Sequence, residues 1–168
     1  QDHYQLHWNQ QYDRNWSSSV SLNYTYGRGY FEQYEENGDL AFHEIGPVEV
    51  GNTTIEESDL IRRRWLDNDY YVVKGDLNYK DNQIDIKTGA FFSRYDGDHF
   101  GEVIWSRFAG DTEIRDKYYQ GNGVKDEFTS YLKATFRFDN KWSVYGDLQG
   151  RFVNYESTGE TSDKFPFE

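Results

Sequence analysis

Residues 128–155 read F-T-S-Y-L-K-A-T-F-R-F, then D-N-K, then W-S-V-Y-G-D-L-Q-G-R-F-V-N-Y. Alternate positions on one face are mostly apolar or aromatic: Phe128, Leu132, Ala134, Phe136, Phe138, Trp142, Val144, Leu148 and Phe152. The positions between them are mostly polar or charged. Alternation on both sides of a short polar turn predicts two long antiparallel strands with one apolar and one polar face.

The register of this hairpin follows from its turn. If residues 139–141 form the loop, Phe138 lies opposite Trp142, and apolar positions then meet apolar positions along both strands. The same register places Lys133 opposite Asp147 on the polar face, which is a favourable cross-strand arrangement. We therefore predict an ion pair between these two side chains.

Two further hairpins repeat the pattern. Residues 2–12 and 16–26 alternate around the turn Asp13-Arg14-Asn15, which places Tyr4 opposite Tyr24 and Trp8 opposite Val20. Residues 70–79 and 84–95 alternate around a turn at Asp81-Asn82. That register puts Tyr79 opposite Ile84 and predicts a second ion pair, between Asp76 and Lys87.

Stretches rich in glycine and acidic residues separate the hairpins, and we predict that they are long surface loops. Within the first of them, residues 58–68 are expected to form a short helix with Ser58 as its N-cap. The expected fold is all-β, a single domain formed by an antiparallel up-and-down meander of about six long strands. The predicted strands are 2–12, 16–26, 70–79, 84–95, 128–138 and 142–155, and the predicted loops are 27–68, 97–127 and 156–168.

Short turns at one rim and long loops at the other are typical of outer-membrane β-barrels. Aromatic residues near both ends of the predicted strands fit the two aromatic belts of such barrels, and Lys133, Asp147, Asp76 and Lys87 would then point into the lumen. Since barrels of this class need about eight strands, we expect a segment of a larger transmembrane barrel. A chain that begins at Gln1 and contains no methionine also suggests a processed chain or a piece of a longer one.

Composition narrows the possible functions. The net charge of −12 and the isoelectric point of about 4.7 disfavour a nucleic-acid partner. The absence of cysteine excludes disulfides and cysteine-ligated metal sites. The mean hydropathy of −1.00 is low, but an aromatic content of 19% argues against disorder and for β-structure.

The strand sequences also resemble a known family. The segments W-S-S-S-V-S-L-N-Y-T-Y-G-R-G-Y-F-E-Q-Y (16–34), D-Y-Y-V-V-K-G-D-L-N-Y (69–79) and W-S-V-Y-G-D-L-Q-G-R-F (142–152) are similar in pattern to the barrel of TonB-dependent outer-membrane receptors, in particular the Bacteroidetes type. The resemblance implies a barrel of about 22 strands. It also implies active uptake of a scarce ligand of the siderophore, cobalamin or glycan class. The implied partners are TonB, reached through other parts of the parent chain, and outer-membrane lipid.

Candidate ligand contacts fall in the predicted loops. Arg62 and Arg64, next to Trp65, are candidates for gripping an anionic ligand; alternatively, the arginines balance the charges of Glu56, Glu57 and Asp59. Aromatic side chains at Trp105, Tyr118 and Tyr119 are candidates for stacking on a sugar, a corrin or a catecholate. Equally, these three residues pin a long loop to its neighbour.

No motif predicts a metal site, a cofactor or catalysis. The four histidines lack a zinc-ligand spacing, and the acidic run at Asp96 lacks the spacing of a calcium loop. No serine lies in a G-x-S-x-G motif. We therefore expect a bacterial outer-membrane receptor segment and not an enzyme. The alternatives are a soluble all-β module that binds a ligand or carbohydrate, and a porin-like or adhesin barrel without TonB coupling.

Overall fold

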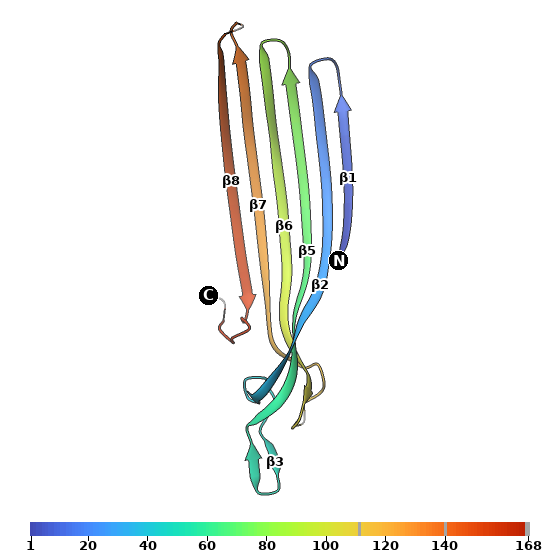
Figure 1. The fold of residues 1–168 in the computed structure, drawn as a ribbon, viewed down its shortest axis with the longest axis vertical. Helices are drawn as coiled ribbons and strands as arrows, with labels where there is room; N and C mark the ends of the chain where they lie inside the picture. The colour runs from blue at the N-terminus through green and yellow to red at the C-terminus, as the bar shows by residue number, and fades with distance from the viewer. Residues whose placement is uncertain (111, 140, 167–168) are drawn as a thin grey trace. The chain divides into compact units, whose positions relative to one another are not determined.

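The computed structural model describes residues 1–110, 112–139 and 141–166, and the fold is all-β, as predicted. Six strands form one antiparallel meander in the order β1-β2-β5-β6-β7-β8 (Figure 1), and β3 and β4 form a separate small hairpin. The strands are β1 (Asp2–Gln11), β2 (Trp16–Asp39), β3 (Val48–Val50), β4 (Thr53–Ile55), β5 (Glu57–Lys80), β6 (Ile84–Ser106), β7 (Lys117–Arg137) and β8 (Ser143–Gly159).

The described residues include no helix that is long and apolar enough to cross a membrane.

The chain forms two compact units. We call the first the sheet unit, and it comprises Gln1–Tyr26, Asp69–Asp96 and Val124–Glu156. The second, the core unit, comprises Gly27–Asn68, Gly97–Gly123 and Ser157–Glu168. The long strands β2, β5, β6 and β7 contribute residues to both units.

Each hairpin of the sheet unit closes on a turn that begins with an aspartate. These turns read D-R-N-W, D-N-Q-I and D-N-K-W, beginning at Asp13, Asp81 and Asp139. In each one, a carboxylate oxygen accepts hydrogen bonds of 2.6–2.8 Å from the backbone amides two and three residues later. The aspartate thus satisfies two amides that the turn leaves without a backbone partner.

Neighbouring turns are also joined to each other. The Lys80 amide donates to the Asn15 carbonyl at 2.9 Å, and the Arg137 amide donates to the Gln83 carbonyl at 2.7 Å. The three tight turns therefore lie at one end of the sheet unit, the upper end in Figure 1.

Two of the three predicted registers are confirmed. Tyr4 pairs with Tyr24 and Trp8 with Val20 between β1 and β2. At the β7–β8 turn, the Phe138 amide donates to the Trp142 carbonyl at 3.0 Å. In that register Lys133 Nζ lies 3.4 Å from Asp147 Oδ2, which confirms the predicted ion pair.

The register of the β5–β6 hairpin differs from the prediction by two residues. The Asp81 amide donates to the Ile84 carbonyl at 2.8 Å, so these two residues lie opposite each other. The prediction placed Tyr79 opposite Ile84, with Asp81 inside the loop. The carboxylate cap explains the difference, because it requires Asp81 to precede the loop. A shift of two residues leaves every side chain on its predicted face.

This shift removes the predicted pair between Asp76 and Lys87. The new register places Asp76 opposite Gly89, where an added Cβ would lie 2.6 Å from Asp76 Oδ1. The Asp76 carboxylate instead contacts Lys74 on its own strand, at 3.2 Å, and also accepts hydrogen bonds from Ser19 and Tyr131. No ion pair involves Lys87 within the described part of the chain.

The stretches 27–68 and 97–127 are largely strand, so the prediction of long irregular loops there was wrong. β2 continues to Asp39, β5 begins at Glu57, β6 continues to Ser106 and β7 begins at Lys117. The helix predicted over 58–68 is part of β5, and the third predicted loop begins as the end of β8. Alternation fails here because both faces carry charged residues, and those residues pair across strands: Arg63 with Glu32 at 2.8 Å, and Arg28 with Asp67 at 3.2 Å.

The hydrophobic core lies entirely in the core unit. Its buried members are Leu40, Ile45, Leu60, Val103, Tyr118 and Tyr119. Gly101 is required beside them, because a Cβ at this position would overlap the rings of both tyrosines. In contrast, no hydrophobic side chain is buried among the described residues of the sheet unit.

Candidate functional site

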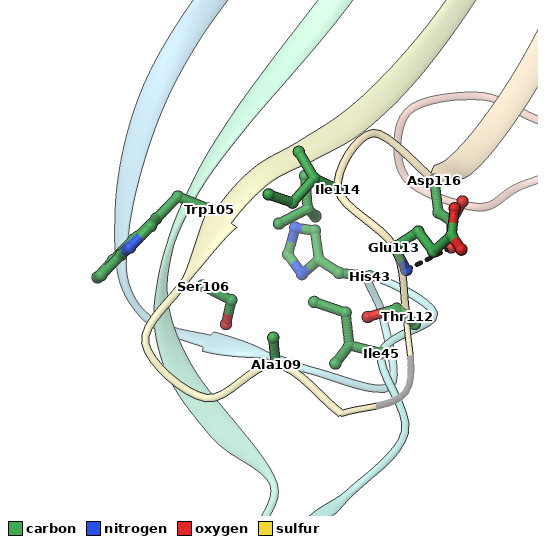
Figure 2. Close-up of a pocket in the computed structure, with 10 residues that line it drawn as sticks. His43, Ile45, Trp105, Ser106, Ala109, Thr112, Glu113, Ile114 and Asp116 are labelled. Atoms are coloured by element: carbon green, nitrogen blue, oxygen red, sulfur yellow. Dashed lines mark hydrogen bonds between the residues drawn. The ribbon is translucent and has the colours of Figure 1, made fainter.

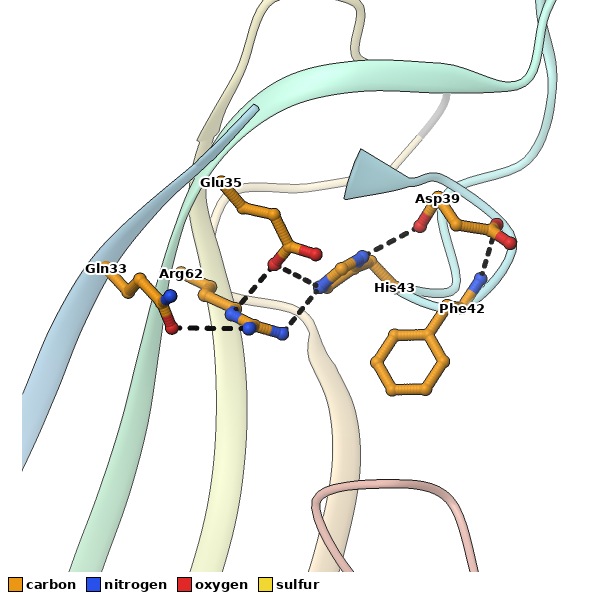
Figure 3. Close-up of polar contacts among 6 residues, drawn as sticks. All are labelled: Gln33, Glu35, Asp39, Phe42, His43 and Arg62. Atoms are coloured by element: carbon orange, nitrogen blue, oxygen red, sulfur yellow. Dashed lines mark hydrogen bonds and ion pairs between the residues drawn. The ribbon is translucent and has the colours of Figure 1, made fainter. Parts of the chain in front are cut away.

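A buried polar cluster lies beside the core of the core unit (Figure 3). Arg62 on β5 is on the same strand face as the buried Leu60, and only 9% of Arg62 is exposed. Its Nε lies 3.0 Å from Glu35 Oε2, and its Nη2 donates to Gln33 Oε1 at 3.3 Å. Burial of the guanidinium thus depends on the charge of Glu35 and on one hydrogen-bond acceptor, Gln33, both from β2.

The third member, His43, is held by the turn that follows β2. Asp39 Oδ1 accepts a hydrogen bond from the Phe42 amide at 3.0 Å, and the Ile45 amide donates to the Leu40 carbonyl at 2.9 Å. Leu40 and Ile45 are both buried in the core on either side of the histidine. The turn therefore places the His43 side chain in the interior, where only 1% of that side chain is exposed.

The hydrogen bonds of His43 assign its protonation. Nδ1 lies 2.7 Å from the Asp39 carbonyl oxygen, which can only accept, so Nδ1 carries the proton. Burial lowers the pKa of His43 below its usual value and the Arg62 charge adds to this, whereas the Asp39 carbonyl and Glu35 act in the opposite direction. The ring is therefore neutral near pH 7, and Nε2 accepts from Arg62 Nη1 at 3.4 Å.

One carboxylate lies close to both basic side chains of this cluster, Arg62 and His43. Glu35 Oε2 is close to Arg62 Nε but neither atom makes an aligned hydrogen bond, so the contact is mainly one of charge. The same oxygen lies 3.7 Å from His43 Nε2. The cluster is balanced only while His43 is neutral, because Glu35 then faces a single positive charge.

A small pocket adjoins His43 (Figure 2). Its lining residues are His43, Ile45, Val103, Trp105, Ser106, Ala109, Thr112, Glu113, Ile114 and Asp116. The cavity volume is about 40 Å³, well below the roughly 150 Å³ of an engineered cavity that holds benzene. A siderophore, a corrin or a sugar ring does not fit in it.

The three aromatic residues predicted to contact a ligand do not form one surface. Trp105 lines the pocket, but 46% of the residue is exposed and its indole points away from His43 (Figure 2). Tyr118 and Tyr119 are buried, with ring centroids 5.0 Å apart, and burial raises the pKa of Tyr119. The Tyr118 ring lies 4.7 Å from the His43 ring. These two tyrosines are thus core residues, as in the alternative that they pin neighbouring segments.

Trp65 belongs to a separate array of aromatic and charged side chains. Its indole Nε1 donates to Glu102 Oε2 at 2.9 Å, and its ring stacks on Phe100 with centroids 5.9 Å apart. The Arg28 guanidinium lies 4.9 Å from the Trp65 ring, and the Tyr30 ring lies 4.6 Å from it. The indole of Trp65 is thus in contact with other side chains of the protein on several sides.

Two arginines of the triplet pair with acids other than those predicted. Arg62 faces Glu35 and Arg63 faces Glu32, whereas Asp59 pairs with Arg107 at 3.4 Å. Within residues 1–110, 112–139 and 141–166, Arg64 makes no ion pair and its buried Nε has no hydrogen-bond partner.

Sequence reasoning missed Glu35 and the inward position of His43. The signal for the histidine was the apolar spacing of D-L-A-F-H-E-I, in which Leu40, Phe42 and Ile45 surround it. Glu35 carries no comparable signal, because it is one of several acids in a polar run.

Among the residues that the structure describes, no group of three or more histidine, aspartate or glutamate side chains is placed to hold a metal ion. Comparison of the chain with protein-family models, with curated proteins and with solved structures finds no match.

Proposed function

We propose that this chain forms part of the wall of an outer-membrane β-barrel, in a receptor of the TonB-dependent type. The observation that carries the proposal is the uncovered apolar face of the sheet unit. Leu6 is 62% exposed, Leu132 is 46% exposed and Leu148 is 73% exposed, although each lies on the apolar side of its strand. A contiguous apolar face of this kind requires a partner, and lipid is the partner that a single-layer sheet fits.

The opposite face supports the same assignment. It carries hydrogen-bonded and charged pairs such as Lys133 with Asp147 at 3.4 Å and Arg151 with Glu127 at 2.8 Å. Charged residues of a barrel point to its water-filled interior, because a charge on the lipid face costs about 2–4 kcal/mol at the bilayer midplane. In the proposed barrel this polar face lines the lumen.

The two edges of the sheet explain why we propose a segment and not a whole barrel. In the described part of the chain, β1 and β8 each have one neighbour, β2 and β7 respectively. Closure of such a barrel takes about eight strands or more, so further strands of a longer protein would pair with both edges.

The role of the core unit follows from this arrangement and from the family resemblance. We assign to it the capture of a scarce ligand of the siderophore, cobalamin or glycan class at the bacterial cell surface, because function concentrates on segments held by a rigid scaffold. TonB would couple uptake to energy through parts of the parent protein beyond these residues. The proposed activity is transport, not catalysis.

Fluorescence quenching tests the membrane assignment. These 168 residues contain no cysteine, so Leu148→Cys and Gln149→Cys, made in a full-length protein freed of any other cysteine, each place a label at a known position. The two are neighbours on β8, and both are exposed. In membranes, brominated lipid should quench a label at 148, and aqueous iodide should quench one at 149. Equal quenching of both labels by iodide, with the protein soluble without detergent, would instead indicate the soluble binding module.

Energy coupling requires a second measurement. Cells that carry the full-length gene should accumulate radiolabelled cobalamin, ferric siderophore or oligosaccharide only when TonB is present. A protein that passes the lipid test but whose uptake does not change on deletion of TonB would be a porin-like barrel.

A further inference from the structure

We propose that His43, Arg62 and Glu35 form an acid-sensitive latch, which holds the 39–45 turn on the core of the core unit and releases it when His43 is protonated. The three side chains converge from the turn, from β5 and from β2 (Figure 3). The inference concerns the core unit alone and holds whether or not the sheet unit lies in a membrane.

The groups that face His43 already include the positive charge of Arg62, and they do not offset the cost of a second buried positive charge on the histidine. From β2 come Glu35, already in contact with Arg62, and Asp39, whose carbonyl accepts from Nδ1. β5 contributes the Arg62 guanidinium at 3.4 Å, and β7 contributes the uncharged ring of Tyr118.

The pocket beside His43 holds the remaining ionisable groups. Glu113 and Asp116 line it from the segment before β7, and Asp116 Oδ2 accepts from the Glu113 amide at 2.9 Å (Figure 2). Neither carboxylate makes an ion pair with His43 within the described ranges of the chain. Among the described residues, Glu35 is therefore the only acid in ion-pair contact with the histidine, and the charge of the Asp39 carboxylate adds a further attraction.

Protonation of His43 has two consequences. Nε2 ceases to be an acceptor, so Arg62 Nη1 loses its hydrogen bond to the ring. Two buried cations then share one carboxylate, and a buried charge without a partner is costly. Both effects oppose the closed arrangement, and both are relieved if the turn moves His43 into water.

The pH at which release begins follows from linkage. Burial lowers the pKa of folded His43 below the value of 6.5 that an exposed histidine has. The open state consequently binds more protons than the closed state between these two pKa values, so the closed state is favoured above about pH 6.5 and loses stability as the pH falls below it. Uptake of one proton changes the opening constant by up to about tenfold per pH unit in this window.

Release would expose two core residues. Leu40 and Ile45, which are 0% and 4% exposed, belong to the same turn and leave the core with it. Backbone bonds complete the closed turn: Leu40 N donates to Glu56 O at 2.9 Å, which ties the turn to the residue before β5, and Ile45 N donates to Leu40 O at 2.9 Å within the turn. The protection of these amides against hydrogen exchange therefore reports the state of the latch.

The experiment is hydrogen exchange of the full-length protein from about pH 8 to about pH 5, followed in the peptide that covers residues 39–46 and corrected for the intrinsic rate. Wild-type protection should be constant above about pH 6.5 and then fall by up to about tenfold per pH unit. His43→Asn keeps an N–H donor near the Asp39 carbonyl but cannot titrate, so its protection should not depend on pH. His99→Asn removes an exposed histidine of the same unit and should retain the acid response.

Two results would overturn the latch: wild-type protection that does not change with pH, or an acid response that persists in His43→Asn. If that variant does not fold, Glu35→Gln keeps the proposal testable. Loss of this carboxylate removes a charge that favours protonated His43 in the closed state, so the acid response should be at least as large as in the wild type. A smaller acid response in Glu35→Gln would also contradict the proposal.

Discussion

The sheet unit and the core unit use the same four long strands in different ways. In the sheet unit, each strand carries most of its apolar side chains on one face, and that face is uncovered. In the core unit, β2, β5, β6 and β7 carry charges and aromatic rings that pair with each other, while Leu60, Val103 and Tyr118 are buried. The comparison shows that one strand can bury apolar side chains within the protein along part of its length and leave an apolar face uncovered along the rest.

This difference predicts where substitutions will matter in water. A substitution in the core unit removes a side chain that is buried inside the protein, whereas one on the apolar face of the sheet unit removes a side chain that is already largely exposed. Paired substitutions, one in each unit, therefore test the comparison directly.

The largest difference is expected between two leucines. Leu60→Ala removes a fully buried side chain and should destabilise the core unit by about 2–5 kcal/mol. Leu148→Ala changes a side chain that is 73% exposed and should leave the core unit unchanged. Hydrogen exchange of core-unit amides in both variants measures the change in opening free energy. Equal effects of the two substitutions would contradict the division into two units.

A pair of glycines gives the next largest effect. An added Cβ at Gly101 overlaps the rings of Tyr118 and Tyr119, so Gly101→Ala should cost about 1–3 kcal/mol. Gly146→Ala is the matched control, because an added Cβ there meets no described atom within 4 Å. Urea titration followed by tyrosine fluorescence should show a lower midpoint only for the Gly101 variant.

The strands of the sheet unit could be predicted because their side chains follow a simple rule. Uniform faces made the alternation visible, and same-face pairing gave the correct register around Asp13 and Asp139. The third register was missed because face alternation does not distinguish registers that differ by two residues. Only the aspartate cap at Asp81 does so, and this cap can be read from the shared D-x-x-[WI] spacing of the three turns.

The core unit escaped prediction for a different reason. Its strands carry partners such as Arg63 and Glu32, which satisfy each other across strands that are far apart in the sequence. The sequence of any one strand in the core unit therefore shows no periodic pattern. Its runs rich in glutamate and glycine resemble the composition of loops. Nor did the sequence distinguish Arg62, which joins the cluster at His43, from Arg64, which has no such partner within the described residues.

The aspartate caps give a prediction of intermediate size. Asp81→Ala removes two hydrogen bonds to backbone amides, of 2.8 and 2.6 Å, and each such bond contributes about 1 kcal/mol. The expected result is faster exchange of the Gln83 and Ile84 amides, with no change in the core-unit peptides. The matched variant is Asp81→Asn, because the oxygen of an asparagine side chain can still cap the turn. If both variants exchange alike, the cap does not hold the register.

The smallest effect is expected for the ion pair of the sheet unit. Lys133 and Asp147 lie 3.4 Å apart with side chains that are 47% and 38% exposed, so water screens their interaction. A double-mutant cycle with Lys133→Ala and Asp147→Ala should give a coupling of about 0.2–1 kcal/mol that decreases as salt is added. The effect of salt also bears on the proposed barrel, because a pair in a water-filled lumen is accessible to ions. A coupling that salt does not change would place this face against a covering layer, and the sheet unit would then be half of a sandwich.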